Sequence, residues 1–183
     1  MKQIFTIAAS MIMVSVYSQT TKQEEITDSS FPKNEIKVNA LSPLLFGAFE
    51  AGYERHLTKK SSLGVSFLKV FDAKKNEDMN YYISPYYRRY FGKKPSSGFF
   101  AEGFGMLSSI DGKKIYDTEE HLTFKENPDV IDLSLGLGVG WKWVSKKGIV
   151  IEANTGYGKL LFNPNKTDHT VTFKLGLNLG YRF

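Results

Sequence analysis

A strict alternation of apolar and polar side chains near the end of the chain is the feature that most limits its fold. Residues 171–183 read V-T-F-K-L-G-L-N-L-G-Y-R-F, so odd positions are apolar or aromatic and even positions are polar, charged or glycine. A period of two sends these two sets to opposite faces of a β-strand. The unbroken pattern, with an aromatic last member, favours a strand of a membrane-spanning β-barrel whose apolar row faces lipid.

The same alternation recurs upstream and predicts eight strands in total. Residues 130–144 repeat it most clearly, and the other expected strands cover 35–46, 48–57, 62–71, 81–91, 98–109 and 149–161. Pro43 is tolerable only near a strand end or bulge, and Pro85 is expected to interrupt the fourth strand. The predicted fold is all-β, an eight-stranded antiparallel transmembrane up-and-down β-barrel. The register of the fourth and fifth strands stays open, because Phe100, Phe104 and Met106 alternate in phase with Glu102.

The connections between these strands are short and long in turn. The short ones are T-K-K-S, G-K-K-P-S-S and S-K-K-G, whereas residues 72–80, 110–129 and 162–169 form longer polar segments. Bacterial barrels have short periplasmic turns and longer outer loops. A tight first turn around Gly47 is the exception. The arrangement predicts an aromatic girdle at the periplasmic rim, formed by Trp141, Trp143, Tyr181 and Phe183.

The amino-terminal region predicts export. An uncharged run from Ile4 to Val16 follows Lys2. This run is too short to cross a bilayer as a helix, so residues 1–18 are predicted to be a signal peptide, with an anchor helix as the alternative. The polar residues 19–34 are expected to be a flexible periplasmic lead-in, and residues 35–183 the barrel. The expected location is the outer membrane of a Gram-negative cell.

Composition narrows the chemistry of the chain. With no cysteine there is no disulfide or thiol chemistry. A net charge of +5 arises from dispersed lysines without an aromatic-spaced basic groove, so no nucleic-acid partner is expected. His56, His121 and His169 lack zinc-site spacing, so neither a metal nor a cofactor is expected.

Charged residues on the inward rows predict a polar cluster in the periplasmic half of the lumen. Eight strands leave an interior that side chains fill, so three acids and three bases should form an ion-paired plug. A narrow ion or water path is the alternative, and paired carboxylates acting as acid and base are a further one. The members are Glu54, Arg88, Glu102, Lys142, Glu152 and Arg182.

A lipid A hydrolase and a secreted carrier are the alternative classes of protein. An outer-rim hydrolase acting on lipid A needs a serine beside a histidine that a carboxylate orients. Asp168 and His169 supply an acid and a base, and Ser108 and Ser109 are the nearest outer-rim serines, but no complete triad is visible, so no enzyme is expected. A secreted lipocalin-type carrier needs a large apolar interior, whereas glycines and charges share one face here.

Three segments resemble a known family. They are N-A-L-S-P-L-L-F-G-A-F-E-A-G-Y-E-R-H-L at 39–57, I-S-P-Y-Y-R-R-Y-F at 83–91 and G-F-F-A-E-G-F-G at 98–105. With the glycine-alternating end, they resemble the DUF3575 family of small outer-membrane β-barrel proteins from Gram-negative bacteria, over residues 35–183. The resemblance implies an eight-stranded outer-membrane barrel without an assigned activity. The final Y-R-F also resembles the signal read by the barrel-assembly machinery, which implies that machinery as a partner.

The expected role is therefore structural or surface interaction. Outer loops at residues 72–80, 110–129 and 162–169 carry many charges and few large apolar residues. A polar partner such as a sugar or a lipopolysaccharide head group is expected there, beside the lipid of the outer membrane.

Overall fold

A computed structural model describes residues 31–72, 74–75, 79–112, 114–116, 124–126, 128–163, 166–167 and 169–183. The chain divides into two units, Met1–Phe31 and Pro32–Phe183. The predicted signal peptide and all but the end of the predicted lead-in lie outside the described residues. The account below concerns the second unit.

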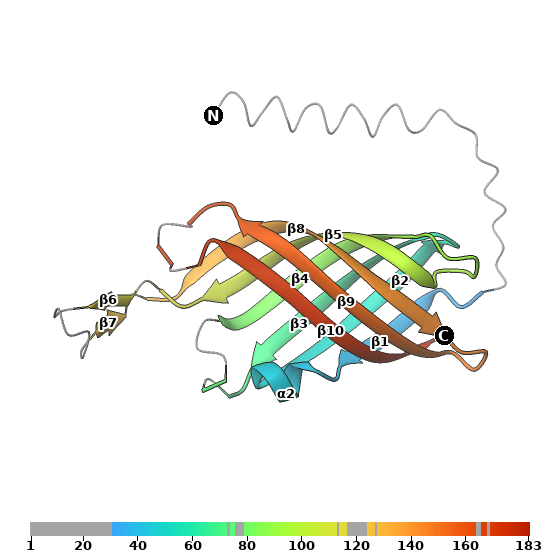
Figure 1. Cartoon of the computed structure of the whole chain (residues 1–183), viewed down its shortest axis with the longest axis horizontal. Coiled ribbons are helices and arrows are strands. Elements are labelled where there is room, and N and C mark those ends of the chain that lie inside the picture. Colours follow the sequence, from blue (N-terminus) through green and yellow to red (C-terminus); the bar gives the residue numbers. More distant parts are fainter. Residues whose placement is uncertain are drawn as a thin grey trace, which may run out of the picture. The chain divides into compact units, whose positions relative to one another are not determined.

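Eight strands close into a barrel in which every neighbouring pair is antiparallel (Figure 1). Each strand pairs with the next barrel strand along the chain, and β10 returns to β1, so the predicted up-and-down barrel is confirmed. The strands are β1 (Asn34–Asn39), β2 (Ala48–Thr58), β3 (Ser61–Val70), β4 (Met79–Tyr90), β5 (Gly98–Ile110), β8 (Val130–Val144), β9 (Ile149–Leu160) and β10 (Val171–Arg182).

The barrel has two different ends. At the short-turn end, brief connections join β2 to β3, β4 to β5 and β8 to β9, and the backbones of Asn34 and Phe183 exchange hydrogen bonds of 2.9 and 2.8 Å. The long-loop end carries the other connections, and Figure 1 shows them at the opposite side from the label C. The alternation of short and long connections therefore follows the sequence prediction.

The first strand is shorter than expected, and this corrects the prediction of a strand over residues 35–46. β1 ends at Asn39, and a short helix, α2 (Ser42–Phe46), follows. Pro43 lies in the first turn of this helix, where its missing N–H costs nothing, whereas it would break a strand ladder. Gly47 is not a hairpin turn: it ends the helix with φ +54° and donates its N–H to the carbonyl of Ser42.

Two further details differ from a plain barrel. The connection at residues 110–129 contains a two-stranded antiparallel sheet, β6 (Lys114–Tyr116) with β7 (Phe124–Glu126), instead of a loop alone. β4 continues through Pro85, although its pairing with β5 skips Ser84 and Pro85. Ser84 Oγ donates a 2.8 Å hydrogen bond to the carbonyl of Gly105 on β5 at this point. A side chain thus binds a neighbouring-strand carbonyl beside the residue that has no N–H.

The two faces of the barrel wall are chemically opposite. Apolar and aromatic side chains point outward, with Leu137 76% exposed and Phe173 59% exposed. Acids, bases and glycines occupy the alternate positions and face the lumen, as the buried Lys142 and Asp132 illustrate. The apolar interior that a lipocalin-type carrier needs is therefore replaced by a charged one over most of the lumen. Within the described residues, no helix has the length and apolar character that crossing a membrane requires.

Candidate functional site

The lumen of the short-turn half holds a dense cluster of buried ions. All six residues predicted for it lie there, and Glu54, Lys142 and Arg88 are at most 2% exposed. The structure adds four members that were not predicted for this cluster: Glu35, Lys37, His56 and Lys174, the last of which also borders the cavity of the long-loop half. Four acids thus face five permanent bases and one histidine, and these ten residues are called the lumen cluster below.

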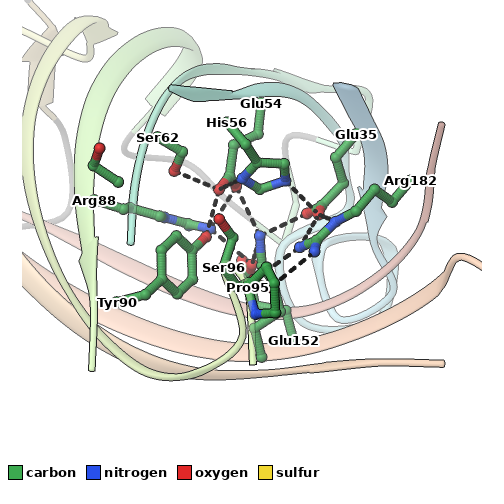
Figure 2. Close-up of polar contacts among 12 residues, drawn as sticks. Glu35, Glu54, His56, Ser62, Arg88, Tyr90, Pro95, Ser96, Glu152 and Arg182 are labelled. Carbon is green, nitrogen blue, oxygen red and sulfur yellow. Dashed lines mark hydrogen bonds and ion pairs between the residues drawn. The ribbon is translucent and has the colours of Figure 1, made fainter. Parts of the chain in front are cut away.

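Glu54 lies at the centre of the lumen cluster (Figure 2). Its carboxylate accepts hydrogen bonds from side chains of four other strands, so it is saturated although fully buried. The donors are Lys37 Nζ at 2.7 Å, Arg88 Nη1 at 2.9 Å, Lys142 Nζ at 3.0 Å, Ser62 Oγ at 2.6 Å, Tyr86 OH at 3.3 Å and Tyr90 OH. Such saturation is what allows a buried charge to persist in the ionised state.

Arg88 connects Glu54 with two of the other three acids of the cluster. Its Nε donates to Glu102 at 2.6 Å, and its Nη1 donates to Glu152 at 2.7 Å. The guanidinium carbon also lies 4.3 Å from the ring centroids of both Tyr86 and Phe100. Arginine suits this position because its planar fork forms several directed hydrogen bonds while its faces stack on aromatic rings.

The β4–β5 turn folds across the short-turn end. Arg182 binds Glu35 through Nη2 at 2.9 Å and also donates to the carbonyls of Pro95 at 3.1 Å and Ser96 at 2.8 Å (Figure 2). The N–H of Ser96 in turn donates to the carbonyl of Lys59 in the β2–β3 turn at 2.6 Å. Ser96 is fully buried, so the turn acts as a lid over the cluster.

Almost no empty space remains in the middle of the lumen. The cavity beside Lys37, Arg88 and Glu152 has a volume of about 20 Å³. That volume holds about one water molecule. The described side chains of the lumen cluster therefore form a plug of paired ions around this small void.

His56 lies between two acids, Glu35 and Glu54, in surroundings that do not suit a metal ion. Glu35, Glu54 and His56 offer ligand atoms within 4.8 Å of one another, yet Lys142 Nζ contacts both carboxylates, at 2.7 and 3.0 Å. A metal cation would stand directly beside that ammonium group, so the charge balance does not fit a metal. Ser62 donates to Glu54 and not to His56, so the order of a hydrolase triad is also missing.

The long-loop half contains a cavity of about 430 Å³. Its walls are largely apolar and come from α2, β2, β3, β4, β5, β10 and the adjoining loops. Glu50 is the acid at this cavity, and three side chains already satisfy it. Tyr82 OH donates to its Oε1 at 2.6 Å, while Asn39 Nδ2 at 2.6 Å and Ser42 Oγ at 3.0 Å donate to its Oε2.

The remaining predicted sites separate into three groups. The girdle residues Trp141, Trp143, Tyr181 and Phe183 all point outward near the short-turn end, each at least 50% exposed. Ser108 and Ser109 are buried near the long-loop end, where His169 borders the large cavity. His121 and Asp168 lie outside the described residues.

The positions of the additional lumen charges follow the same alternation of polar and apolar residues. Glu35 and Lys37 alternate with Ile36 and Val38, and Lys174 belongs to the even row of the last strand. The same period of two therefore places them in the lumen.

Two outer-membrane proteins of known structure are similar to this barrel. The N-terminal β-barrel domain of OprF from Pseudomonas aeruginosa superposes with a TM-score of 0.55 at 14% identity, covering 84% of this chain and 98% of that domain. The outer-membrane protein Ail of Yersinia pestis gives a TM-score of 0.41 at 18% identity, covering 83% of this chain and 99% of Ail. OprF supports the barrel fold. No curated protein matches the sequence.

The sequence itself identifies a family. The profile described as "Protein of unknown function (DUF3575)" matches residues 5–180, which include every barrel strand in whole or in part. The resemblance found in the three motif segments is therefore confirmed, and this chain belongs to the DUF3575 family.

Proposed function

We propose that this protein is an integral outer-membrane β-barrel with a closed lumen and a structural or surface-contact role. The observation that carries the proposal is the sorting of side chains between the faces of the wall. Large apolar residues clothe the outside of a closed cylinder, and buried ion pairs fill its short-turn half.

An apolar medium explains this outer surface better than water does. Soluble monomers rarely expose extended apolar patches, whereas here outward rows on all eight strands carry them. Closure of the sheet also leaves few unpaired backbone groups, which is the condition for strands to cross a hydrocarbon layer. The outward Trp141, Trp143 and Tyr181 suit an interfacial girdle on the periplasmic side.

The long-loop end is the proposed contact surface. Lys74, Lys75 and Lys166 are exposed there, which suits anionic groups such as those of lipopolysaccharide. We assign the protein no enzymatic activity, and we expect the barrel-assembly machinery as its partner during insertion. These roles follow from the family resemblance and from the charge of the loops.

A narrow solute conduit is the second candidate, and the filled lumen argues against it. The void of about 20 Å³ near Arg88 is far smaller than an aqueous channel requires. We expect planar-bilayer recordings of the purified protein to give no discrete conductance steps. Regular steps that vanish on heat denaturation would establish the conduit instead.

A charge placed on the outer wall tests the membrane orientation. Leu177 is 40% exposed on the outward row in the middle of β10. Leu177→Arg should lower the free energy of unfolding in phosphatidylcholine vesicles by about 2–4 kcal/mol, because the charge then faces mid-membrane lipid. Urea titration followed by tryptophan fluorescence measures the change.

Tyr181→Arg is the matched control on the same row near the membrane interface. Its expected cost is only about 0–1 kcal/mol, because a charge near the head groups stays hydrated. Equal costs at the two positions, or none at Leu177, would contradict the proposed orientation.

A further inference from the structure

The barrel wall is incompletely paired at the junction of its first and last strands. β10 pairs with β9 as far as Val171, but it pairs with β1 only as far as the Asn178–Asn39 pair. On the other side of the junction, β2 pairs with β3 up to Ala48 but with β1 only up to Ala51. Within the described chain, the long-loop half of this junction therefore lacks a strand ladder, and α2 lies beside it.

One side chain compensates for part of the missing ladder. Asn39 Nδ2 donates to the carbonyl of Leu175 at 3.0 Å, and Asn39 Oδ1 accepts from the N–H of Leu177 at 3.1 Å. The amide thus replaces one residue of a neighbouring strand. Backbone at membrane depth needs such partners, unless it lines a cavity or is buried in protein. The gap is therefore a built feature of the wall.

The large cavity of the long-loop half lies at this gap. Its lining includes Leu68 and Thr172, whose side chains face the lumen, and also Val171, Phe173 and Leu175 of the outward row of β10. Leu45 of α2 borders it as well. These residues of β10 lie along the edge that β1 leaves unpaired, so the cavity lies against the gap in the wall.

We propose that this cavity is a lateral binding site for the acyl chain of a lipid from the surrounding leaflet. This inference rests on the membrane location proposed above. The volume of about 430 Å³ falls in the usual range of small-molecule pockets, ~300–1,000 Å³. Its opening through an outward apolar row gives access to a chain that is already in the membrane.

The charged groups at the cavity already have partners within the protein, which favours a ligand that places hydrocarbon inside the cavity. Glu50 is satisfied by Tyr82, Asn39 and Ser42, and Lys174 donates to Glu102 at 2.9 Å, so neither ion needs a partner from a ligand. The exposed Lys75 also borders the cavity and suits the negative charge of a lipid head group. An anionic lipid with one chain in the cavity matches both features.

Photolabelling in vesicles tests the site with the whole chain. The protein is reconstituted in phosphatidylcholine containing phosphatidylglycerol with a diazirine on one acyl chain, irradiated and mapped by mass spectrometry. We expect labels on the lumen-facing Leu68, Tyr82 and Thr172 as well as on the outward Leu135 and Leu137. Labels on the outward positions alone would overturn the lateral site while supporting membrane insertion, and labels on neither group would overturn both.

Variants that fill the cavity provide the specificity control. Leu68→Trp should lower labelling of Tyr82 and Thr172 severalfold, whereas Leu135→Trp on the outward row should leave it unchanged. Phe46→Trp on α2 is a second filling variant should Leu68→Trp fail to fold. Unchanged labelling in a folded filling variant would overturn the site. So would labelling of these residues by a short, water-soluble diazirine carboxylate but not by the vesicle lipid, because the ligand would then come from water.

Discussion

The two halves of the lumen are filled differently: buried ion pairs pack the short-turn half, and an apolar cavity occupies the long-loop half. In the short-turn half, buried acids and bases interlock around Glu54, and the void beside Lys37, Arg88 and Glu152 has a volume of about 20 Å³. In the long-loop half, apolar side chains such as Leu68 and Met106 surround a cavity of about 430 Å³. The same strands build both halves, so strand number does not determine whether the lumen is filled.

The difference lies in how the wall is closed. Around the lumen cluster every strand has two neighbours, and the β4–β5 turn covers the end. Around the large cavity the β1–β10 ladder has already stopped. Buried ions require enclosure, because each unpaired charge is costly, whereas an apolar cavity tolerates an opening toward lipid. Ion pairing and complete strand pairing therefore occur together in this barrel.

Removing one acid from each half should give the largest contrast. Glu54→Gln leaves Lys37, Arg88 and Lys142 with excess buried charge, so we expect the free energy of unfolding to fall by about 3–5 kcal/mol. Glu50→Gln weakens hydrogen bonds from Tyr82 and Asn39, which are neutral donors, and its expected cost is about 1.5 kcal/mol. Urea titration in detergent micelles measures both. Equal costs would show that the halves do not differ electrostatically.

A larger side chain should destabilise the filled short-turn half more than the long-loop half that contains the large cavity. A Cβ at Gly140 would overlap the ring of Phe100 and the carbonyl of Ala153, so Gly140→Leu should cost about 1–3 kcal/mol through overpacking. Leu68→Trp extends into the large cavity and should stay below the ~1.5 kcal/mol of a tolerated core exchange. The same urea titration applies, and a larger loss for Leu68→Trp than for Gly140→Leu would reverse the comparison.

The smallest effect is expected at the lid over the short-turn end. Ser96 has φ +42°, a conformation that glycine adopts without strain. Its Oγ makes only long contacts of 3.3 and 3.4 Å to the carbonyls of Thr58 and Lys59. Ser96→Gly should therefore raise the free energy of unfolding by no more than about 1 kcal/mol. Ser97→Gly is the control, because Ser97 has no positive φ to relieve; a similar gain there would contradict the explanation.

Local alternation was sufficient to predict the barrel and most of the lumen cluster. In β8 and β10 the period of two is unbroken, so counting along each strand predicts that Lys142 and Arg182 face the lumen. Pairing of inward ions then follows from the narrowness of an eight-stranded barrel. The same counting applied to Glu35, Lys37, His56 and Lys174 would have completed the cluster.

The end of β1 and the large cavity could not be read from sequence in this way. Residues 40–46 include Leu41, Leu44, Leu45 and Phe46, which fit a strand or a helix equally well over so short a run. Whether β1 continues depends on contacts that α2 makes with the rest of the barrel. The cavity depends in turn on the difference in length between β1 and β10, which is a property of two segments more than a hundred residues apart.

The donors around Glu54 have a consequence for how the barrel comes together. Lys37 belongs to β1, Ser62 to β3, Arg88 to β4 and Lys142 to β8, so the full set exists only when β8 has joined the first four strands. An arc of β1 to β4 already carries five of the six donors to Glu54 and lacks only the ammonium group of Lys142. The arrival of β8 is therefore the assembly step that completes the pairing of this buried carboxylate.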